Sequence, residues 1–391
     1  MNNFTFYTPT YFDFGADAET HVAELIKRFG GTKVLLHYGG GSIKKSGLYD
    51  RVKECLSDAQ IPYVELGGVK PNPRSGLVYE GIELCKKENV DFVLAVGGGS
   101  TIDSAKAIAA GALYEGDFLD FYKGKKTIEK ALPVGTILTI AAAGSEGSPN
   151  TVITDEKTQI KTGARSELLR PRFSILNPAL TCTLPPYQTA AGITDIMVHV
   201  CERYFSNTKE VEITDRLCEA VLKTMICEAP RVMENPDNYD ARANIMWAGM
   251  LAHNNICGVG RVQDWASHHI EHELSALYDV THGAGLAVIT PLWMRYVLEI
   301  NPDKLVLFAT RVWNIDLNIE NPKETALRGI EAFENFLHKI GMPASFEEIG
   351  AREEDIPLMV DKLLGGRETE GNYVKLTRED VIHIFESAVK G

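Results

Sequence analysis

Short apolar runs alternate with amphipathic stretches through the first half of the chain. The runs typical of buried strands lie at residues 33–38, 62–66, 91–96, 134–140, 151–154 and 172–176. Several are followed by glycine and then by a helical pattern, as at residues 75–87 and 101–113. Strands that are apolar on both faces and alternate with helices predict a mostly parallel sheet covered by helices. Residues 151–163 instead predict a hairpin, because turn residues separate two short strands.

The pattern changes after the pair Pro185-Pro186. From Tyr187 onward, apolar residues recur every three or four positions with almost no strand signal, which predicts an all-helical domain. Helices are expected at residues 189–205, 213–227, 241–256, 266–278, 325–340 and 378–390. A chain of 391 residues is too long for one compact core. We therefore expect an α/β domain at residues 1–185 and a helical domain at residues 186–391.

Composition and charge narrow the classes of partner. The net charge of −13 and the pI near 5.3 disfavour nucleic acids and anionic membranes, because both need a positive protein surface. No leader-like segment opens the chain, and no apolar run is long enough to cross a bilayer. The seven cysteines are an odd number, scattered and without a CxxC pair, which indicates free thiols. We expect a cytoplasmic protein that binds neither nucleic acid nor membrane.

Two glycine clusters follow predicted strands. The strand at residues 91–96 continues into Gly97, Gly98, Gly99 and Ser100 and then into a helix. Glycines let a backbone approach a ligand, and a helix N-terminus favours anions, so this segment predicts a cradle for a pyrophosphate. It is not the GxGxxG fingerprint, and a plain strand-to-helix turn remains an alternative.

The second cluster, Gly39-Gly40-Gly41-Ser42, follows the strand at residues 33–38. No carboxylate stands there to bind a ribose 2′-hydroxyl, whereas Ser42, Lys44 and Lys45 could receive a 2′-phosphate. This weakly favours NADP(H), although an ordinary glycine turn is equally compatible with the pattern.

Histidines concentrate in the helical half, where six of the ten lie between residues 199 and 282. Asp195 and His199 are four residues apart in a helical pattern, and His268 and His272 repeat that spacing on a second helix. His282 follows after a short break. One carboxylate and three or four imidazoles from facing helices are what a divalent metal requires, and they suit zinc and iron(II) equally. The segment around Glu146 lacks the GxSxG pattern of a serine nucleophile.

Long motifs make the chain resemble the iron-containing, or group III, alcohol dehydrogenases, and within them the bacterial butanol dehydrogenase branch. The motifs are Tyr7-Thr-Pro-Thr, Tyr38-Gly-Gly-Gly-Ser-Ile-Lys-Lys, Lys70-Pro-Asn-Pro-Arg, Gly97-Gly-Gly-Ser, Ala143-Gly-Ser-Glu, Gln188 to His199, and Asp264 to Gly283. The last two are highly specific. The resemblance implies a Rossmann-like nucleotide-binding domain, a helical catalytic domain of the dehydroquinate synthase-like architecture, and an active site in the cleft between them.

Site residues follow from the resemblance position by position. The metal ligands would be Asp195, His199, His268 and His282, and His272 would lie near the substrate without binding the metal. The pyrophosphate would lie at Gly97 to Ser100, the nicotinamide end near Asp103, and the adenosine ribose at Gly40, Gly41 and Ser42. Further cofactor-lining positions would be Asn72, Thr139, Lys161 and Thr183. Many relatives carry hydroxyl residues where this chain has Ile140 and Ala143, and some carry an aromatic residue where it has His253.

The implied reaction is hydride transfer between NADP(H) or NAD(H) and a short primary alcohol or aldehyde of the butanol and butanal type. An iron(II) ion, or zinc, would act as a Lewis acid on the substrate oxygen. By residue type and helical position, His272 is the candidate for passing the alcohol proton to solvent, and a role in orienting its neighbours is the alternative. We expect both cofactors to work, with NADPH moderately preferred, and a homodimer or larger homo-oligomer. Two rivals are a polyol or phospho-sugar enzyme of the dehydroquinate synthase or glycerol dehydrogenase type, and a metal hydrolase or non-catalytic nucleotide-binding protein.

Overall fold

The computed structural model describes residues 1–390 and resolves two compact units. The α/β unit comprises Tyr7–Leu184 together with Pro236–Met250. The helical unit comprises Met1–Phe6, Pro185–Asn235 and the chain from Leu251 onward. Each unit has its own core of buried apolar side chains.

A six-stranded sheet forms the centre of the α/β unit, in the order β1-β8-β5-β4-β2-β3. All neighbouring strands are parallel, which confirms the predicted parallel sheet. The strands are β1 (Tyr11–Phe14), β2 (Val34–Tyr38), β3 (Tyr63–Leu66), β4 (Phe92–Gly97), β5 (Val134–Leu138) and β8 (Phe173–Leu176). Strand β1 was not predicted, because only four residues form it and its aromatic pattern is that of an exposed edge.

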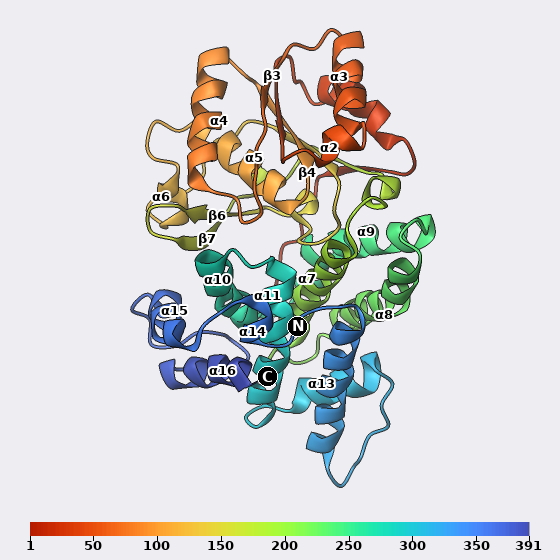
Figure 1. Cartoon of the computed structure of the whole chain (residues 1–391), viewed down its shortest axis with the longest axis vertical. Helices are drawn as coiled ribbons and strands as arrows, with labels where there is room; N and C mark the ends of the chain where they lie inside the picture. Colours follow the sequence, from red (N-terminus) through yellow and green to blue (C-terminus); the bar gives the residue numbers. More distant parts are fainter. Residues whose placement is uncertain (391) are drawn as a thin grey trace. The chain divides into compact units, whose positions relative to one another are not determined.

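Helices cover both faces of this sheet, as the apolar strands require. Along β4, Val93 and Ala95 face one apolar cluster with α4 and α5, whereas Phe92, Leu94 and Val96 face another. In Figure 1, α4 and α3 accordingly lie on opposite sides of the strands. The helices are η1 (Ala18–His21), α1 (Val22–Arg28), α2 (Ser42–Lys45), α3 (Leu48–Asp58), α4 (Ser75–Glu88), α5 (Gly99–Ala112), α6 (Leu119–Tyr122), η2 (Ser145–Gly147), η3 (Glu167–Leu169) and η4 (Pro178–Thr181).

The strand order contains a switch point between β2 and β4. From β2 the chain moves outward to β3, returns to β4 on the other side of β2, and then continues to β5 and β8. Ligands of open α/β sheets bind at the carboxyl ends of the strands beside such a reversal. The two glycine clusters follow β2 and β4, so the topology brings both to the switch point.

A separate antiparallel hairpin joins β6 (Asn150–Asp155) to β7 (Ile160–Arg165), which confirms the predicted hairpin. The helix α9 (Tyr239–His253) begins within the α/β unit, where its Trp247 packs edge-on against Phe12 and Phe14 of β1, with ring centroids 5.8 Å apart in each case.

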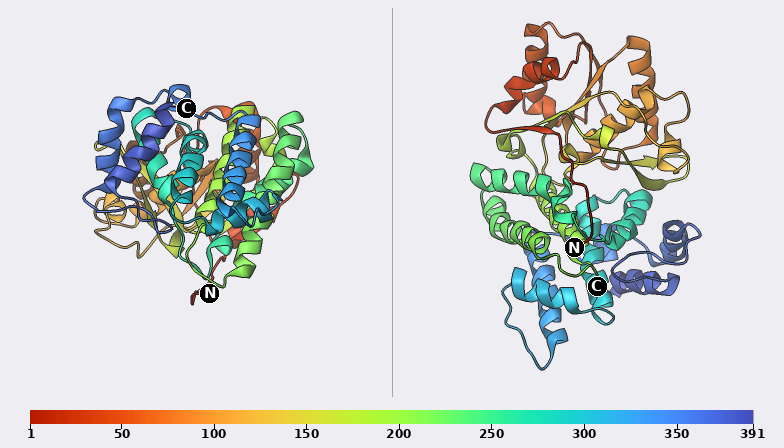
Figure 2. Two further views of the ribbon diagram at one scale, coloured as in Figure 1. Left: turned by 90° about the horizontal axis from the view of Figure 1, so that it is seen from below. Right: turned by 180° about the vertical axis from the view of Figure 1, so that it is seen from behind.

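Helices and connecting loops build the helical unit, as the green and blue parts of Figure 2 show. Its helices are α7 (Pro186–Tyr204), α8 (Glu212–Glu234), η5 (Ile256–Gly258), α10 (Ala266–Tyr278), α11 (His282–Leu298), α12 (Asp303–Leu307), the π-helix η6 (Phe308–Val312), α13 (Pro322–Lys339), α14 (Phe346–Ile349), η7 (Glu353–Asp355), α15 (Ile356–Leu364) and α16 (Arg378–Lys390). The predicted all-helical texture is confirmed. No helix within residues 1–390 is long and apolar enough to cross a membrane.

Several helices differ from the sequence prediction, which did not include α11, α12, α14 or α15. Helix α11 was not predicted, because it is apolar on nearly every side and contains Pro291, so it lacks the polar face that produces a helical period. Helix α8 runs past the predicted end at residue 227 to Glu234 and accommodates Pro230 in its last turns.

Candidate metal and cofactor sites

One face of α7 carries three acidic or basic side chains into the interior of the helical unit. Asp195, His199 and Glu202 are spaced four and three residues apart, so they point in one direction. All three are at least 95% buried. Burying such groups costs free energy unless they are paired, so their partners indicate the function of this face of α7.

Glu202 holds the start of α10. Its carboxylate accepts hydrogen bonds from the main-chain N–H of Trp265 at 2.8 Å, from the main-chain N–H of His268 at 2.9 Å, and from the Ser267 hydroxyl at 2.6 Å. It also lies 3.1 Å from Nδ1 of His268. Burial alone would raise the pKa of Glu202, but the bonds from His268 outweigh it and lower the pKa to about 2. An ionised carboxylate only accepts, so Nδ1 of His268 is the donor, and this orientation directs Nε2 toward Asp195.

His282 begins α11 and is oriented in the same way. Its Nδ1 donates to Oε2 of Glu271, a fully buried carboxylate one turn after His268 on α10. The next residue, Gly283, packs against α7 so closely that a Cβ there would lie 2.0 Å from the carbonyl oxygen of Ala191. Only glycine permits this approach of α11 to α7, and the approach brings His282 to Asp195.

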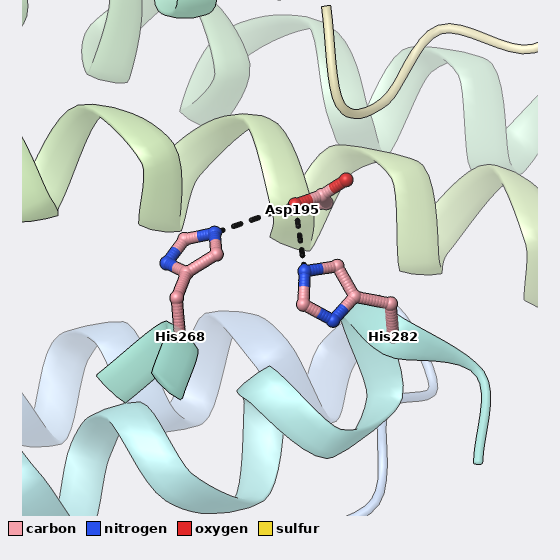
Figure 3. Close-up of side chains that lie close together, drawn as sticks. All are labelled: Asp195, His268 and His282. Atoms are coloured by element: carbon pink, nitrogen blue, oxygen red, sulfur yellow. Dashed lines mark ion pairs between the residues drawn. The ribbon is translucent and has the colours of Figure 1, made fainter. Parts of the chain in front are cut away.

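The three side chains of Asp195, His268 and His282 converge from α7, α10 and α11, as Figure 3 shows. Oδ1 of Asp195 lies 3.8 Å from Nε2 of His268 and 3.7 Å from Nε2 of His282. The three ligand atoms all lie within 4.8 Å of one another. Within the described chain, the buried atoms Oδ1 of Asp195 and Nε2 of His268 make no hydrogen bond.

His199 lies beside this group rather than within it. Its Nδ1 is 2.9 Å from the main-chain oxygen of Asp195 and 3.0 Å from Oδ1 of the same residue. Its ring packs between those of His253 and His268, each with its centroid 4.4 Å away. Burial lowers the pKa of His199 to about 4, so the imidazole is neutral. A neutral ring whose Nδ1–H donates to a carbonyl keeps Nε2 available as a ligand.

A buried arginine forms hydrogen bonds with both His199 and the neighbouring His253. Arg203 donates to the main-chain oxygen of His199 at 2.5 Å and to Nδ1 of His253 at 2.8 Å. Its guanidinium lies 4.6 Å from the ring centroid of Trp265, a residue held at the strained φ of 95°. His253, at a position where some relatives carry an aromatic residue, therefore packs against a predicted ligand.

His272 is half-buried, and its ring centroid lies 5.6 Å from that of His282. On its other side, the ring of His269 is 6.0 Å away, and the side chain of His269 is 42% exposed. Exposure therefore increases from Asp195, at 5%, through His282, at 23%, to His269. The ring of His272 therefore lies near both His282 and the more exposed His269.

This arrangement fits a divalent metal. Two buried ligand atoms make no hydrogen bond within the described chain, and two histidines present Nε2 because a carboxylate contacts each Nδ1, which is the usual outer shell of a histidine-ligated metal. Glu202 and Glu271 were not among the predicted site residues. Each lies three residues after a predicted ligand, His199 and His268, and that spacing was the signal available.

The predicted pyrophosphate cradle joins β4 to α5. Gly97 ends the strand, Gly98 is the residue before the helix, and Gly99 opens α5. Positive φ values do not explain these glycines, since none occurs there. The lack of room for a side chain explains them instead. A Cβ at Gly98 would lie 2.1 Å from Cγ2 of Ile140, and one at Gly99 would lie 3.3 Å from Cβ of Ala143. The two departures from the family motif therefore pack directly over the cradle.

The glycines of the second cluster are under no such constraint. A Cβ at Gly40 or Gly41 would meet no atom within 4 Å, and neither residue has a positive φ. Lys44 lies over the aromatic rings of Tyr38 and Tyr49, with its Nζ 5.3 and 4.9 Å from their centroids. Nothing within the protein requires glycine at these two positions, which leaves open space beside β2.

The remaining predicted cofactor residues are partly brought together. Nζ of Lys161 donates to Oδ1 of Asn72 at 3.0 Å, and both side chains are buried. The main-chain N–H of Thr139 donates to the oxygen of Gly97 at 3.0 Å, which places Thr139 at the cradle. Thr183, in contrast, is exposed after η4.

Asp103 is fixed by the protein itself. Its carboxylate accepts from the Ser145 hydroxyl at 2.6 Å and from the main-chain N–H of Val152 at 3.0 Å. Burial raises its pKa. One turn later the buried Lys106 donates to main-chain oxygens of Ser145 and Ser148 at 2.6 and 2.8 Å, and burial lowers its pKa to about 8. These bonds hold the loop after β5 against α5.

Comparison with known families covers most of the chain. Residues 9–178 match the model of the iron-containing alcohol dehydrogenases, and residues 189–389 match the C-terminal model of the Fe-containing alcohol dehydrogenase family. A probable NADH-dependent butanol dehydrogenase of Bacillus subtilis is 44% identical over the full length of both chains. The NADPH-dependent aldehyde reductase YqhD of Escherichia coli is 37% identical over 93% of each.

A solved structure gives the same result. The crystal structure of NADH-dependent butanol dehydrogenase A from Thermotoga maritima superimposes with a TM-score of 0.96 at 45% identity, covering 100% of this chain and 99% of that one. The match includes both the parallel sheet and the helical unit, and it confirms the fold that the sequence predicted. The chain belongs to the iron-containing alcohol dehydrogenase family.

Proposed function

We propose that this protein is an NAD(P)-linked alcohol dehydrogenase and aldehyde reductase that acts on short-chain primary alcohols and aldehydes of the butanol and butanal type. The observation that carries the proposal is the convergence of Asp195, His268 and His282, where two buried ligand atoms make no hydrogen bond, in a chain that matches this family over most of its length. Relatives named as butanol dehydrogenases and as an aldehyde reductase support the substrate class.

The proposed metal ligands are Asp195, His199, His268 and His282, and the proposed metal is iron(II), with zinc as an alternative. A divalent metal held there supplies a Lewis acid that polarises the substrate oxygen. The protein's own contribution is orientation: Glu202 and Glu271 each contact the Nδ1 of one histidine, so that its Nε2 is directed toward Asp195. The domain assignment, with residues 1–185 binding the dinucleotide and residues 186–391 binding the metal, rests on the same matches.

We propose that His272 transfers the alcohol proton. Its position between His282 and the more exposed His269 supports this role, because a proton leaving the site needs an imidazole that solvent can reach. A purely orienting role would leave the pH dependence of kcat unchanged in a His272→Gln variant. The proton-transfer role predicts a change in that pH profile.

The dinucleotide is proposed to bind at the carboxyl ends of β2 and β4. Gly97, Gly98, Gly99 and Ser100 would receive the pyrophosphate on the N-terminus of α5. Gly40, Gly41 and Ser42 would face the adenosine ribose. The remaining cofactor-lining residues are proposed to be Asn72, Asp103, Thr139, Lys161 and Thr183.

The choice between the two dinucleotides stays a prediction. Open space at Gly40 and Gly41 admits a 2′-phosphate, as the sequence analysis expected for NADPH. The relatives named as NADH-dependent are more similar to this chain, at 42 to 44% identity, than the one named as NADPH-dependent, at 37%. That order favours NADH instead.

We further propose a homo-oligomer in a reducing, cytoplasmic setting. Tyr11 and Phe14 of the edge strand β1 and the neighbouring Trp247 are each 40% exposed, a surface suited to contact with a second copy. All seven cysteines are free thiols. Light scattering coupled to size-exclusion chromatography tests the oligomer directly.

The decisive test is oxidation of NADH or NADPH by butanal with the iron(II)-loaded protein, followed by absorbance. The proposal predicts turnover with at least one cofactor and its loss after metal removal by a chelator. If butanal is inert while glycerol or a phosphorylated sugar is oxidised, the protein is instead a polyol or phospho-sugar enzyme. Hydrolysis without any change in the cofactor would indicate the hydrolase class.

A further inference from the structure

The buried carboxylate of Glu271 has no place in the ligand set, yet it contacts that set directly. It lies on α10, is fully buried, and accepts from Nδ1 of His282 on α11. Its second oxygen accepts from the hydroxyl of Ser275, one turn further along α10. A carboxylate placed in a protein interior normally has a task, because removing it from water is costly.

The surrounding chain makes room for this carboxylate. At Gly285 on α11, a Cβ would lie 2.6 Å from Oε1 and 2.7 Å from Cγ of Glu271. Glycine at this position therefore leaves space for the Glu271 side chain, in the same turn in which Gly283 allows α11 to approach α7. The first turn of α11 is thus adapted to two contacts, one with α7 and one with Glu271.

The hydrogen bond decides which nitrogen of His282 faces Asp195. With Nδ1–H donated to Glu271, the ring is held with Nε2 at 3.7 Å from Oδ1 of Asp195. His282 is the most exposed of the three converging side chains, at 23%, so packing alone constrains its ring least. Without the carboxylate, the ring would be free to rotate and to present either nitrogen.

We propose that Glu271 is a positioning residue that presets His282 as an Nε2 ligand by holding its Nδ1–H. This inference rests on the proposed metal centre and adds a residue outside its ligand set. Glu202 has the same relation to His268, but it also accepts from main-chain N–H groups at the start of α10. Removal of Glu202 would disturb the helix itself, so Glu271 gives the cleaner experiment.

The test compares Glu271→Gln, Glu271→Leu and the control Glu273→Gln. Glutamine keeps the size and an acceptor oxygen for His282 while removing the charge, and Ser275 can then donate to the oxygen of Val280, already 3.2 Å away. Leucine removes both acceptor and charge. Glu273 lies two residues away on α10, is also buried, and faces Lys362 at 3.7 Å rather than a ligand.

The measurement is the dissociation constant of Zn²⁺ for the full chain, by competition with a chromophoric chelator, with the visible spectrum of the Co²⁺ form as a second readout. Outer-shell partners of metal ligands typically contribute 10- to 100-fold in affinity. We expect about a 10-fold weaker constant for Glu271→Gln, about 100-fold for Glu271→Leu, and a change below about twofold for Glu273→Gln. The Co²⁺ spectrum should change only in the Glu271 variants.

An unchanged constant for Glu271→Gln, or an equal loss in Glu273→Gln, would overturn the proposal. If Glu271→Leu does not fold, as judged by circular dichroism, the comparison of Glu271→Gln with Glu273→Gln still tests the proposal. Asp195→Ala separates this inference from the metal centre. If that variant binds Zn²⁺ like the wild type, the centre itself is wrong, whereas lost binding there with unchanged Glu271→Gln contradicts only the role of Glu271.

Discussion

The two candidate sites are specified by opposite means. At the metal centre, ionisable side chains from α7, α10 and α11 converge, and buried carboxylates orient them. At the cradle after β4, side chains are mostly absent, and the site consists of main chain, a helix N-terminus and space left by glycine. Substitutions should therefore act through chemistry at the first site and through volume at the second.

The largest effect is expected from His268→Ala. This change removes a proposed ligand, so metal affinity should fall well beyond the roughly 10- to 100-fold typical of outer-shell partners, and turnover should be lost. The helical unit has its own apolar core and should remain folded. Metal content by atomic spectroscopy and circular dichroism check both parts, and a variant with full metal content and turnover would contradict the ligand assignment.

Gly283→Ala tests whether glycine is required where α11 packs against α7 beside the candidate metal site. Its Cβ would meet the main chain of Ala191 at 2.0 Å, so α11 must shift. We expect the free energy of unfolding to fall by about 1 to 3 kcal/mol, with weaker metal binding. Gly40→Ala is the matched control, because open space there predicts a change within about 0.5 kcal/mol. Equal destabilisation of the two variants in urea would contradict this explanation.

At the cradle, Gly98→Val should raise the dissociation constant of the dinucleotide at least about tenfold, or roughly 1.4 kcal/mol. The new side chain would also meet Ile140, at 2.1 Å from the Cβ position. The substitution is therefore best made in an Ile140→Ala background, with Ile140→Ala alone as the control. Fluorescence titration with NADH and NADPH measures the constant. If the double variant binds both cofactors like its control, the phosphates lie elsewhere.

A smaller effect concerns specificity. Gly40→Asp introduces a carboxylate into open space beside Ser42, where it should repel a 2′-phosphate and accept from a ribose hydroxyl. The ratio of kcat/KM for NADH over NADPH should rise relative to the wild type, whichever cofactor the wild type prefers. The same kcat/KM ratio in the wild type and the variant would mean that the loop at Gly40 does not distinguish the two cofactors by their 2′-group.

The smallest effect concerns pH and the core of the α/β unit. Burial lowers the pKa of His37 to about 4, while Nδ1 donates to Leu66 and Nε2 accepts from Ser104. The unfolded chain therefore binds more protons between about pH 6.5 and 4, so stability is present above this window and is lost as pH falls through it. Between pH 7 and pH 6 the contribution should be below about 1 kcal/mol. In the His37→Asn variant, the free energy of unfolding measured in urea should lack this part of its dependence on pH.

Local pattern determined much of this molecule. Alternating strands and helices before residue 185 and helical spacing after it produced the fold class, since those periods depend on neighbours along the chain. The four-residue spacings of Asp195 with His199 and of His268 with His272 likewise placed side chains on common helical faces. The strand β1 and the helix α11 were not predicted, because an edge strand and a fully apolar helix lack those periods.

Only the tertiary structure decided which of those side chains meet. It brought His282 to Asp195 through the contact of Gly283 with Ala191, which no spacing encodes. It also gave Glu202 and Glu271 their partners on other helices. The physical reason is the same in each case: the sequence fixes direction within one element, whereas distance between elements depends on packing and on the space that glycines leave.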